Sequence, residues 1–262
     1  LIGAGNVATH LGKALQDVGY HIAQIYSRTE TSASALGNLL GVTYTTSLDA
    51  VCADADMYIV ALKDSVLQLL LPAIVKGREN ALFVHTAGSL PMDIWKDYAC
   101  HYGVLYPMQT FSKQRVVSFD NISVFVEGCS PQVAALLAGV ASMLTDKVVH
   151  ATSEQRRYLH IAAVFACNFA NAAYGMAAKL LEANGLSFDA MLPLVDETAA
   201  KVHSLHPRDA QTGPARRGDV VVMNAHKAML DGPLKDIYTV LSDYITAEAA
   251  RDNNGNNKIL PQ

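Results

Sequence analysis

The first eight residues constrain the fold of this chain more than any other segment. Gly3, Gly5 and Ala8 form the pattern Gly-x-Gly-x-x-Ala, which is typical of a strand–turn–helix that binds a dinucleotide. The first glycine permits a sharp turn, the second lets the backbone approach a pyrophosphate, and the alanine still permits close helix–strand packing. We expect the helix that begins at Asn6 and Val7 to direct its free N–H groups toward the phosphates.

The residues that follow support this interpretation. An amphipathic segment extends to Val18, Gly19 stops it, and an apolar run follows at residues 22–26. Together they have the length of a βαβ unit. An ordinary glycine turn is the alternative.

The end of the second strand indicates which dinucleotide is bound. An NAD site usually places Asp or Glu there, about 20 residues after the glycines, to bind the ribose 2′-hydroxyl. Here the residues are Ser27, Arg28 and Thr29, so a guanidinium flanked by two hydroxyls replaces the carboxylate. This favours a 2′-phosphate and therefore NADP. In the alternative, Arg28 is a solvated surface residue and Glu30 binds the ribose.

Alternating strand and helix patterns continue to about residue 150 and predict an α/β fold with a doubly wound parallel sheet of the Rossmann type. We expect strands at residues 22–26, 42–45, 57–62, 81–86, 104–106, 121–126 and 147–149, and helices at 32–40, 65–76 and 131–144.

The pattern changes at Thr152, which has a capping-box spacing with Gln155 and precedes thirty residues without proline. Further helical segments follow at 187–203, 219–230 and 233–249. We therefore predict a Rossmann domain at residues 1–150, an all-α domain at 151–250 and a loose polar tail at 251–262.

Composition limits the partners. A net charge of −4 and a pI near 6.1 give no electrostatic reason to expect nucleic acid or an anionic membrane, so a small-molecule substrate fits better. The most apolar stretch, residues 159–178, carries polar side chains and predicts a buried helix rather than a membrane span. Four scattered cysteines fit reduced thiols in the cytoplasm. Because the chain starts inside the first expected strand, we expect a few residues of that strand to precede Leu1.

Ligands of such sheets bind at the carboxyl ends of the strands. Three connections qualify, at residues 61–65, 85–89 and 106–110. We expect Ala61, Leu62 and Lys63 to lie near the nicotinamide-side ribose, and Gly88 and Ser89 to donate hydrogen bonds to a substrate. Alternatively, Gly88 is only a turn residue and Ser89 caps the next helix.

Polar residues on the long helix suggest a cleft. At 100° per residue, His160 and Asn168 lie about 80° apart and can share a broad face. His160 could act as a general acid, because imidazole binds and releases protons near neutrality, and Asn168 could orient a carbonyl or the nicotinamide amide. A histidine that is only a satisfied core residue is the alternative. Arg217 could bind an anionic substrate, and no metal site is expected.

These motifs, together with those at 85–89, 212–214 and 217–219, resemble a bacterial family of NADP oxidoreductases. Its members join a Rossmann domain, similar to those of pyrroline-5-carboxylate reductase and F420-dependent NADP oxidoreductase, to a helical domain known as DUF2520. They are similar to the 6-phosphogluconate dehydrogenase-like group, whose helical domains commonly form dimers. The resemblance therefore implies a homodimer.

One departure affects the expected chemistry. Dehydrogenases of the larger group use a lysine four residues before an asparagine on the long helix, and here that position is Val164. Instead of alcohol oxidation, we expect hydride transfer from NADPH to a small carbonyl or imine in the interdomain cleft, assisted by His160 or a bound water. The alternative is a non-catalytic NADP(H)-binding redox sensor, and a flavin or F420 as the second reactant stays open.

Overall fold

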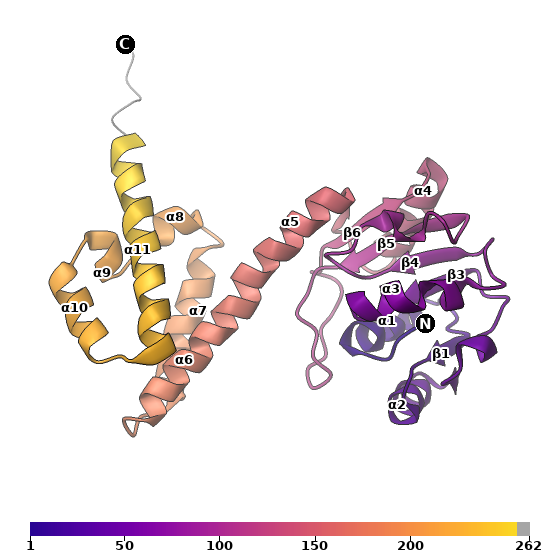
Figure 1. The fold of residues 1–262 in the computed structure, drawn as a ribbon, viewed down its shortest axis with the longest axis horizontal. Helices are drawn as coiled ribbons and strands as arrows, with labels where there is room; N and C mark the ends of the chain where they lie inside the picture. Colours follow the sequence, from indigo (N-terminus) through magenta and orange to yellow (C-terminus); the bar gives the residue numbers. More distant parts are fainter. Residues whose placement is uncertain (256–262) are drawn as a thin grey trace, which may run out of the picture. The chain divides into compact units, whose positions relative to one another are not determined.

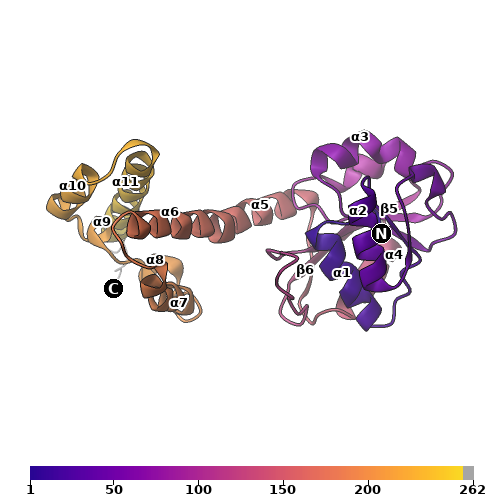
Figure 2. The same ribbon diagram turned by 90° about the horizontal axis from the view of Figure 1, so that it is seen from below.

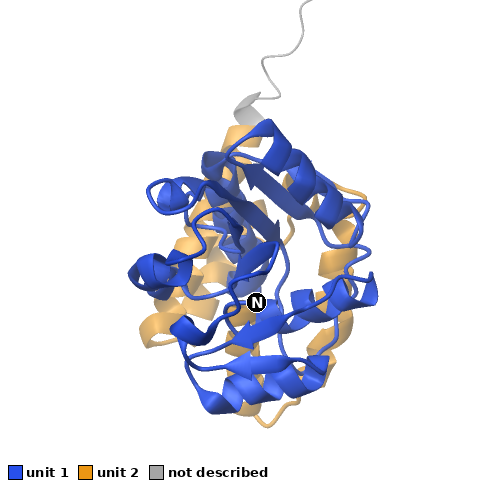
Figure 3. Cartoon of the chain, turned by 90° about the vertical axis from the view of Figure 1, so that its right-hand side faces the viewer, with its two compact units in different colours: residues 1–170 blue, residues 171–262 orange. Residues whose placement is uncertain are grey.

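The structure, a computed structural model, describes residues 1–255, with side chains described to residue 252. The chain divides into two compact units, Leu1–Ala170 and Asn171–Gln262 (Figure 3). Unit 1 holds every strand of the described chain, and unit 2 is helical (Figure 1). The fold class predicted from the sequence, a Rossmann-type α/β domain followed by helices, is confirmed.

The elements of unit 1 alternate as expected, with ends that differ from the predicted ones by a few residues. The strands are β1 (Gln24–Tyr26), β2 (Thr43–Thr45), β3 (Met57–Val60), β4 (Leu82–His85), β5 (His101–Pro107), β6 (Val124–Gly128) and β7 (Val148–His150). The helices are α1 (Asn6–Asp17), α2 (Glu30–Leu40), α3 (Asp64–Val75), α4 (Pro131–Ser142) and α5 (Ser153–Ala163), with short 3-10 turns η1 (Leu48–Ala50) and η2 (Met92–Trp95).

Ile2 connects two groups of strands. β1 pairs with β2, and β3 to β7 pair in sequence order, while Ile2 bridges Tyr26 on one side and Val60 on the other. The pairings are parallel except that between β5 and β6, where the sheet departs from the all-parallel expectation. No helix crosses over between these two strands, and a connection without a crossover helix suits an antiparallel neighbour.

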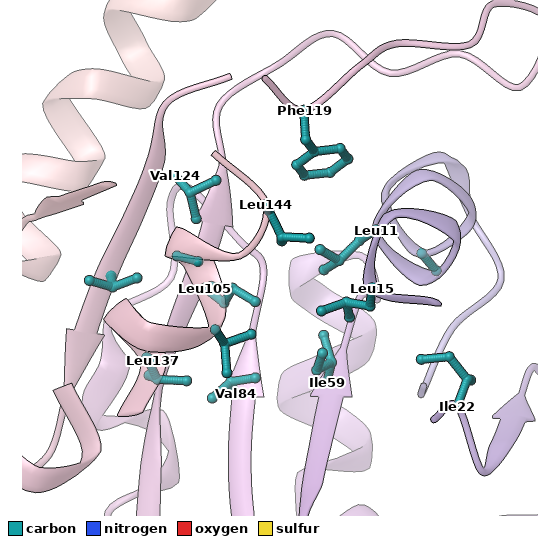
Figure 4. Close-up of a cluster of buried hydrophobic side chains, with 14 of the residues drawn as sticks. Leu11, Leu15, Ile22, Ile59, Val84, Leu105, Phe119, Val124, Leu137 and Leu144 are labelled. Carbon is teal, nitrogen blue, oxygen red and sulfur yellow. The ribbon is translucent and has the colours of Figure 1, made fainter. Parts of the chain in front are cut away.

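The sheet is covered on both faces, as its alternating side chains require. Tyr58 and Val60 of β3 pack with α3, whereas Ile59 between them packs with α1 and α4. Figure 4 shows this second cluster, with Leu11, Leu15, Leu137 and Leu144 gathered over Ile59, Val84 and Leu105. Two buried layers on one sheet define the doubly wound arrangement.

α5 begins with the predicted capping box. The Thr152 hydroxyl accepts from the Gln155 N–H, and the Gln155 side chain accepts from the Thr152 N–H at 2.9 Å. Beyond α5 the helix widens into a π-helical segment, η3 (Val164–Phe169), and then continues as α6 (Ala170–Glu182).

The expectation of a buried helix at residues 159–178 is wrong for the described chain, because none of these residues is buried. Ile161, Phe165 and Phe169 are all exposed. By length and composition alone the continuous helix Ser153–Glu182 could span a membrane, which is weak support for a span.

Unit 2 contains further helices and few buried apolar side chains. Its helices after α6 are η4 (Phe188–Met191, a 3-10 turn), α7 (Leu192–Lys201), α8 (Pro207–Ala210), α9 (Pro214–Arg217), α10 (Val220–Ala228) and α11 (Gly232–Gly255). α11 extends beyond the expected start of the polar tail at residue 251, helped by ion pairs of Asp252 with Arg208 and Arg216. Residues 256–262 of that expected tail lie outside the described residues.

Candidate functional site

The glycine turn has the geometry that a dinucleotide requires. Gly3 has φ +115°, and a Cβ there would collide with the Ala61 carbonyl, so only glycine fits. Gly5 is exposed, and a Cβ would meet nothing within 4 Å, which leaves open space where a pyrophosphate would approach. Gly5 also precedes α1 without any side-chain cap on the first N–H groups, those of Asn6 and Val7 among them. These residues fit the pyrophosphate of a dinucleotide.

The residues after β1 suit a 2′-phosphate. Arg28 is exposed and takes part in none of the ion pairs found among the described residues. Thr29 donates its hydroxyl proton to Ser32 at 2.9 Å. Glu30, the alternative ribose ligand, lies near Tyr44 of β2, and its negative charge helps to raise the pKa of the Tyr44 hydroxyl. This arrangement favours Arg28 over Glu30 as the residue that faces the cofactor.

The end of β3 lies against the glycine turn. The Ala61 N–H donates to the Ile2 carbonyl at 2.8 Å, and Leu62 would approach a Cβ placed on Gly3. Lys63 is exposed and precedes α3. The Ser89 hydroxyl donates to the Asp64 carboxylate, so Ser89 is held by Asp64 rather than capping the helix that follows it.

His160 lies beside the connection after β4. A Cβ on Gly88 would fall 2.6 Å from His160 Nδ1, so the absence of a side chain at residue 88 makes room for the imidazole. The same nitrogen is 3.2 Å from the Tyr106 hydroxyl at the carboxyl end of β5. Burial raises the pKa of Tyr106, which keeps its hydroxyl protonated at neutral pH. His160, Gly88 and Tyr106 therefore form one group.

A buried ion pair fixes α5 beneath this group. Arg156 is 1% exposed and pairs with Glu127 of β6 at 2.7 Å. Its guanidinium also donates to the Ala87 and Leu90 carbonyls on either side of Gly88. Glu127 additionally accepts from the Ser153 hydroxyl at 2.7 Å. One guanidinium thus holds the Gly88 turn against the helix that carries His160.

His85 is fully buried below the turn. Desolvation, followed by the positive charge of Arg156, lowers its pKa to about 3, so it is neutral in the folded protein. Its Nδ1 accepts from the Ala87 N–H at 3.2 Å, and its ring stacks on Trp95. Because it is enclosed and neutral, His85 supports the turn and is not available to a substrate.

The two remaining predicted site residues lie elsewhere in the chain. Asn168 is exposed within η3 and Arg217 is exposed on α9 in unit 2. The separation of 80° between His160 and Asn168 assumed a continuous α-helix and does not hold. A π-helix turns less per residue, which brings residue 168 closer to the face of residue 160.

No cluster of three or more possible metal ligands occurs among the described residues. A cavity of about 680 Å³ lies at the amino ends of the strands, lined by Tyr20, Gln24, Cys52 and Asp56 among others. It is at the opposite edge of the sheet from the glycine turn, so it is not the cofactor site.

Two family models match the chain. Residues 1–87 match "NADP oxidoreductase coenzyme F420-dependent", and residues 122–245 match the DUF2520 domain of unknown function. The solved structure of a Bacteroides fragilis protein described as an NADP oxidoreductase is 53% identical to this chain. It superposes with a TM-score of 0.90 over 94% of this chain and 96% of that one. The chain belongs to this NADP oxidoreductase family. It is accordingly an oxidoreductase whose cofactor is NADP.

More distant structures share the fold. An imine reductase from Myxococcus stipitatus, solved with NADP⁺, is 17% identical, with a TM-score of 0.64 over 97% of this chain and 93% of that one. A pyrroline-5-carboxylate reductase from Streptococcus pyogenes is 15% identical, with a TM-score of 0.63 over 95% and 96%. No curated protein matches the chain.

Sequence reasoning missed Tyr106, Asp64 and Glu127 as members of the group. Tyr106 and Asp64 stand in the strand-end connections that were singled out, so position alone could have marked them. Glu127 carries no motif. Its role depends on the antiparallel placement of β6, which the alternating pattern did not indicate.

Proposed function

We propose that the chain is an NADPH-dependent reductase of a small carbonyl or imine. The observation that carries this proposal is the group of His160, Tyr106 and Gly88 at the carboxyl edge of a dinucleotide-binding sheet. The names of the distant relatives, an imine reductase and a pyrroline-5-carboxylate reductase, favour a C=N bond among the substrates. The interdomain cleft as the place of the substrate remains a prediction.

Bound NADPH supplies the hydride for the substrate carbon, so the protein must supply a proton for the oxygen or nitrogen. His160 in its imidazolium form would donate Nδ1–H to the Tyr106 oxygen and hold a transferable proton on Nε2, which makes no hydrogen bond within the described residues. After transfer, the neutral imidazole keeps its bond to Tyr106. Tyr106 thereby selects which nitrogen faces the substrate.

The cofactor residues proposed from the sequence fit this role. Backbone N–H groups after Gly5 bind the pyrophosphate, and Ser27, Arg28 and Thr29 bind the 2′-phosphate. Ala61, Leu62 and Lys63 lie near the nicotinamide-side ribose. In the substrate site, Gly88 and Ser89 line the position beside His160, while Asn168 and Arg217 would orient or neutralise the substrate.

A homodimer is also proposed. Among the described residues of unit 2, the buried apolar side chains are Ala215, Met223 and Ala249, while Val221 and Val240 are more than 60% exposed. A helical unit with so little burial needs another surface to complete its core, and a second copy of the chain supplies one. The four free cysteines agree with a cytoplasmic location.

The test combines a binding titration with a substrate panel. Wild type should bind NADPH more tightly than NADH and oxidise it with at least one cyclic imine or ketone. His160→Gln should lower kcat by about 10²- to 10⁴-fold and leave the Kd for NADPH unchanged. His101→Gln, at an exposed histidine on the amino end of β5, is the matched control. Tight NADPH binding without turnover on any substrate would favour the redox sensor.

A further inference from the structure

The connection between β5 and β6, residues 108–123, is long and lies on the first turns of α1 (Figure 2). Three contacts hold it there. Asn6 Nδ2 donates to the Phe111 carbonyl at 2.8 Å, and His10 Nε2 donates to the Ser112 carbonyl at 2.9 Å. The His10 ring also stacks on the ring of Phe111 at 4.9 Å between centroids. This 108–123 loop is therefore fixed beside the glycine turn.

The loop places a cation on that turn. Lys113 Nζ donates to the carbonyl of Ala4, between Gly3 and Gly5, at 3.0 Å. Lys113 is exposed and takes part in none of the ion pairs of the described residues. A neutral carbonyl leaves the charge of an ammonium uncompensated. The open space above Gly5 is the place where the two negative charges of a pyrophosphate would lie.

We propose that Lys113 binds the pyrophosphate of the dinucleotide, supported by the 108–123 loop. On binding, the ammonium exchanges the Ala4 carbonyl for a phosphate oxygen and forms a stronger, charge-assisted bond. Asn6 then has two roles, because its backbone N–H faces the phosphate while its side chain anchors the loop. The proposal rests on the assigned cofactor and adds a residue from a segment distant in sequence.

The pyrophosphate is common to NADPH and NADH, whereas the 2′-phosphate near Arg28 is not. This difference separates the two cations experimentally. Lys113→Gln should raise the Kd for NADPH and for NADH by a similar factor of about ten, and the factor should shrink at high salt. Adenosine 2′-monophosphate, which lacks the pyrophosphate, should bind Lys113→Gln as it binds wild type. Arg28→Gln should instead weaken the binding of NADPH and of adenosine 2′-monophosphate and leave the Kd for NADH unchanged.

Titration calorimetry with these ligands provides the test, and Lys96→Gln, at another exposed lysine, is the control. Lys113→Arg should retain most of the affinity. Unchanged dinucleotide affinity in Lys113→Gln would overturn the proposal, as would an equal loss of adenosine 2′-monophosphate, which would indicate a general effect on the loop. If wild type binds neither dinucleotide, the cofactor assignment itself fails, and the lysine proposal fails with it.

Discussion

Protonation of His85 should destabilise the protein in mild acid. Its pKa is about 3 in the folded state, against 6.5 for an ordinary histidine. The folded pKa is the lower of the two, so the unfolded chain binds more protons, and stability is lost as pH falls below 6.5. Between pH 7 and pH 5 the titration of His85 should lower the free energy of unfolding by about 2 kcal/mol. The loss continues toward pH 3 at about 1.4 kcal/mol per pH unit.

The measurement is urea unfolding at pH 7 and at pH 5, followed by the fluorescence of Trp95. Trp95 is the single tryptophan and is buried in unit 1 beside His85, so its signal reports the unfolding of that unit. His85→Asn does not titrate and keeps an acceptor for the Ala87 N–H. This variant should be less stable than wild type at pH 7 because packing is lost. Between pH 7 and pH 5, however, its free energy of unfolding should fall by about 2 kcal/mol less than that of wild type. The control is His101→Asn, at an exposed site. Parallel losses in wild type and His85→Asn would refute the reasoning.

Three further predictions concern the cofactor, the ion pair and the turn. Arg28→Gln should raise the Kd for NADPH at least about tenfold and leave NADH unchanged in a fluorescence titration, because only NADPH carries the 2′-phosphate. Glu127→Ala leaves Arg156 buried without a counter-charge. It should therefore lower the free energy of unfolding by about 3 kcal/mol and the melting temperature by about 6–12 °C. In calorimetry, adding Arg156→Met to this variant should recover much of the lost stability. Gly88→Ala should displace His160 from Tyr106, so that kcat falls at unchanged NADPH affinity; an unaltered kcat would remove the contact from the proposed mechanism.

The sequence predicts the Rossmann unit well because its signals are local. A glycine turn, a capping box and the alternation of short apolar runs with helical segments each depend on a few neighbouring residues. The widening of the helix at Val164 and the antiparallel placement of β6 carry no such signal. Both depend on how segments pack after folding, and the pattern of apolar residues is compatible with either arrangement.

The sequence points to some residues of the candidate site for the same reason, and their roles stay predictions. Arg28 and Gly88 follow strand ends, where topology places ligands, and His160 was marked by its position on the polar face of the long helix. The pairing of His160 with Tyr106 joins residues separated by 54 positions, and that of Arg156 with Glu127 joins residues 29 apart. The fold brings such partners together, and a single sequence does not show which distant residues will be in contact.

The carboxylate of Glu127 binds several groups at once. It receives the guanidinium of Arg156, the hydroxyl of Ser153 and the backbone N–H of Ser153, at the start of the helix that carries His160. Replacing any one of the three side chains leaves the others with unmet charge or hydrogen-bonding capacity. Substitutions at Glu127, Arg156 and Ser153 should therefore be epistatic. We expect related sequences to keep all three residues or to replace them together, and single replacements at these positions to be selected against.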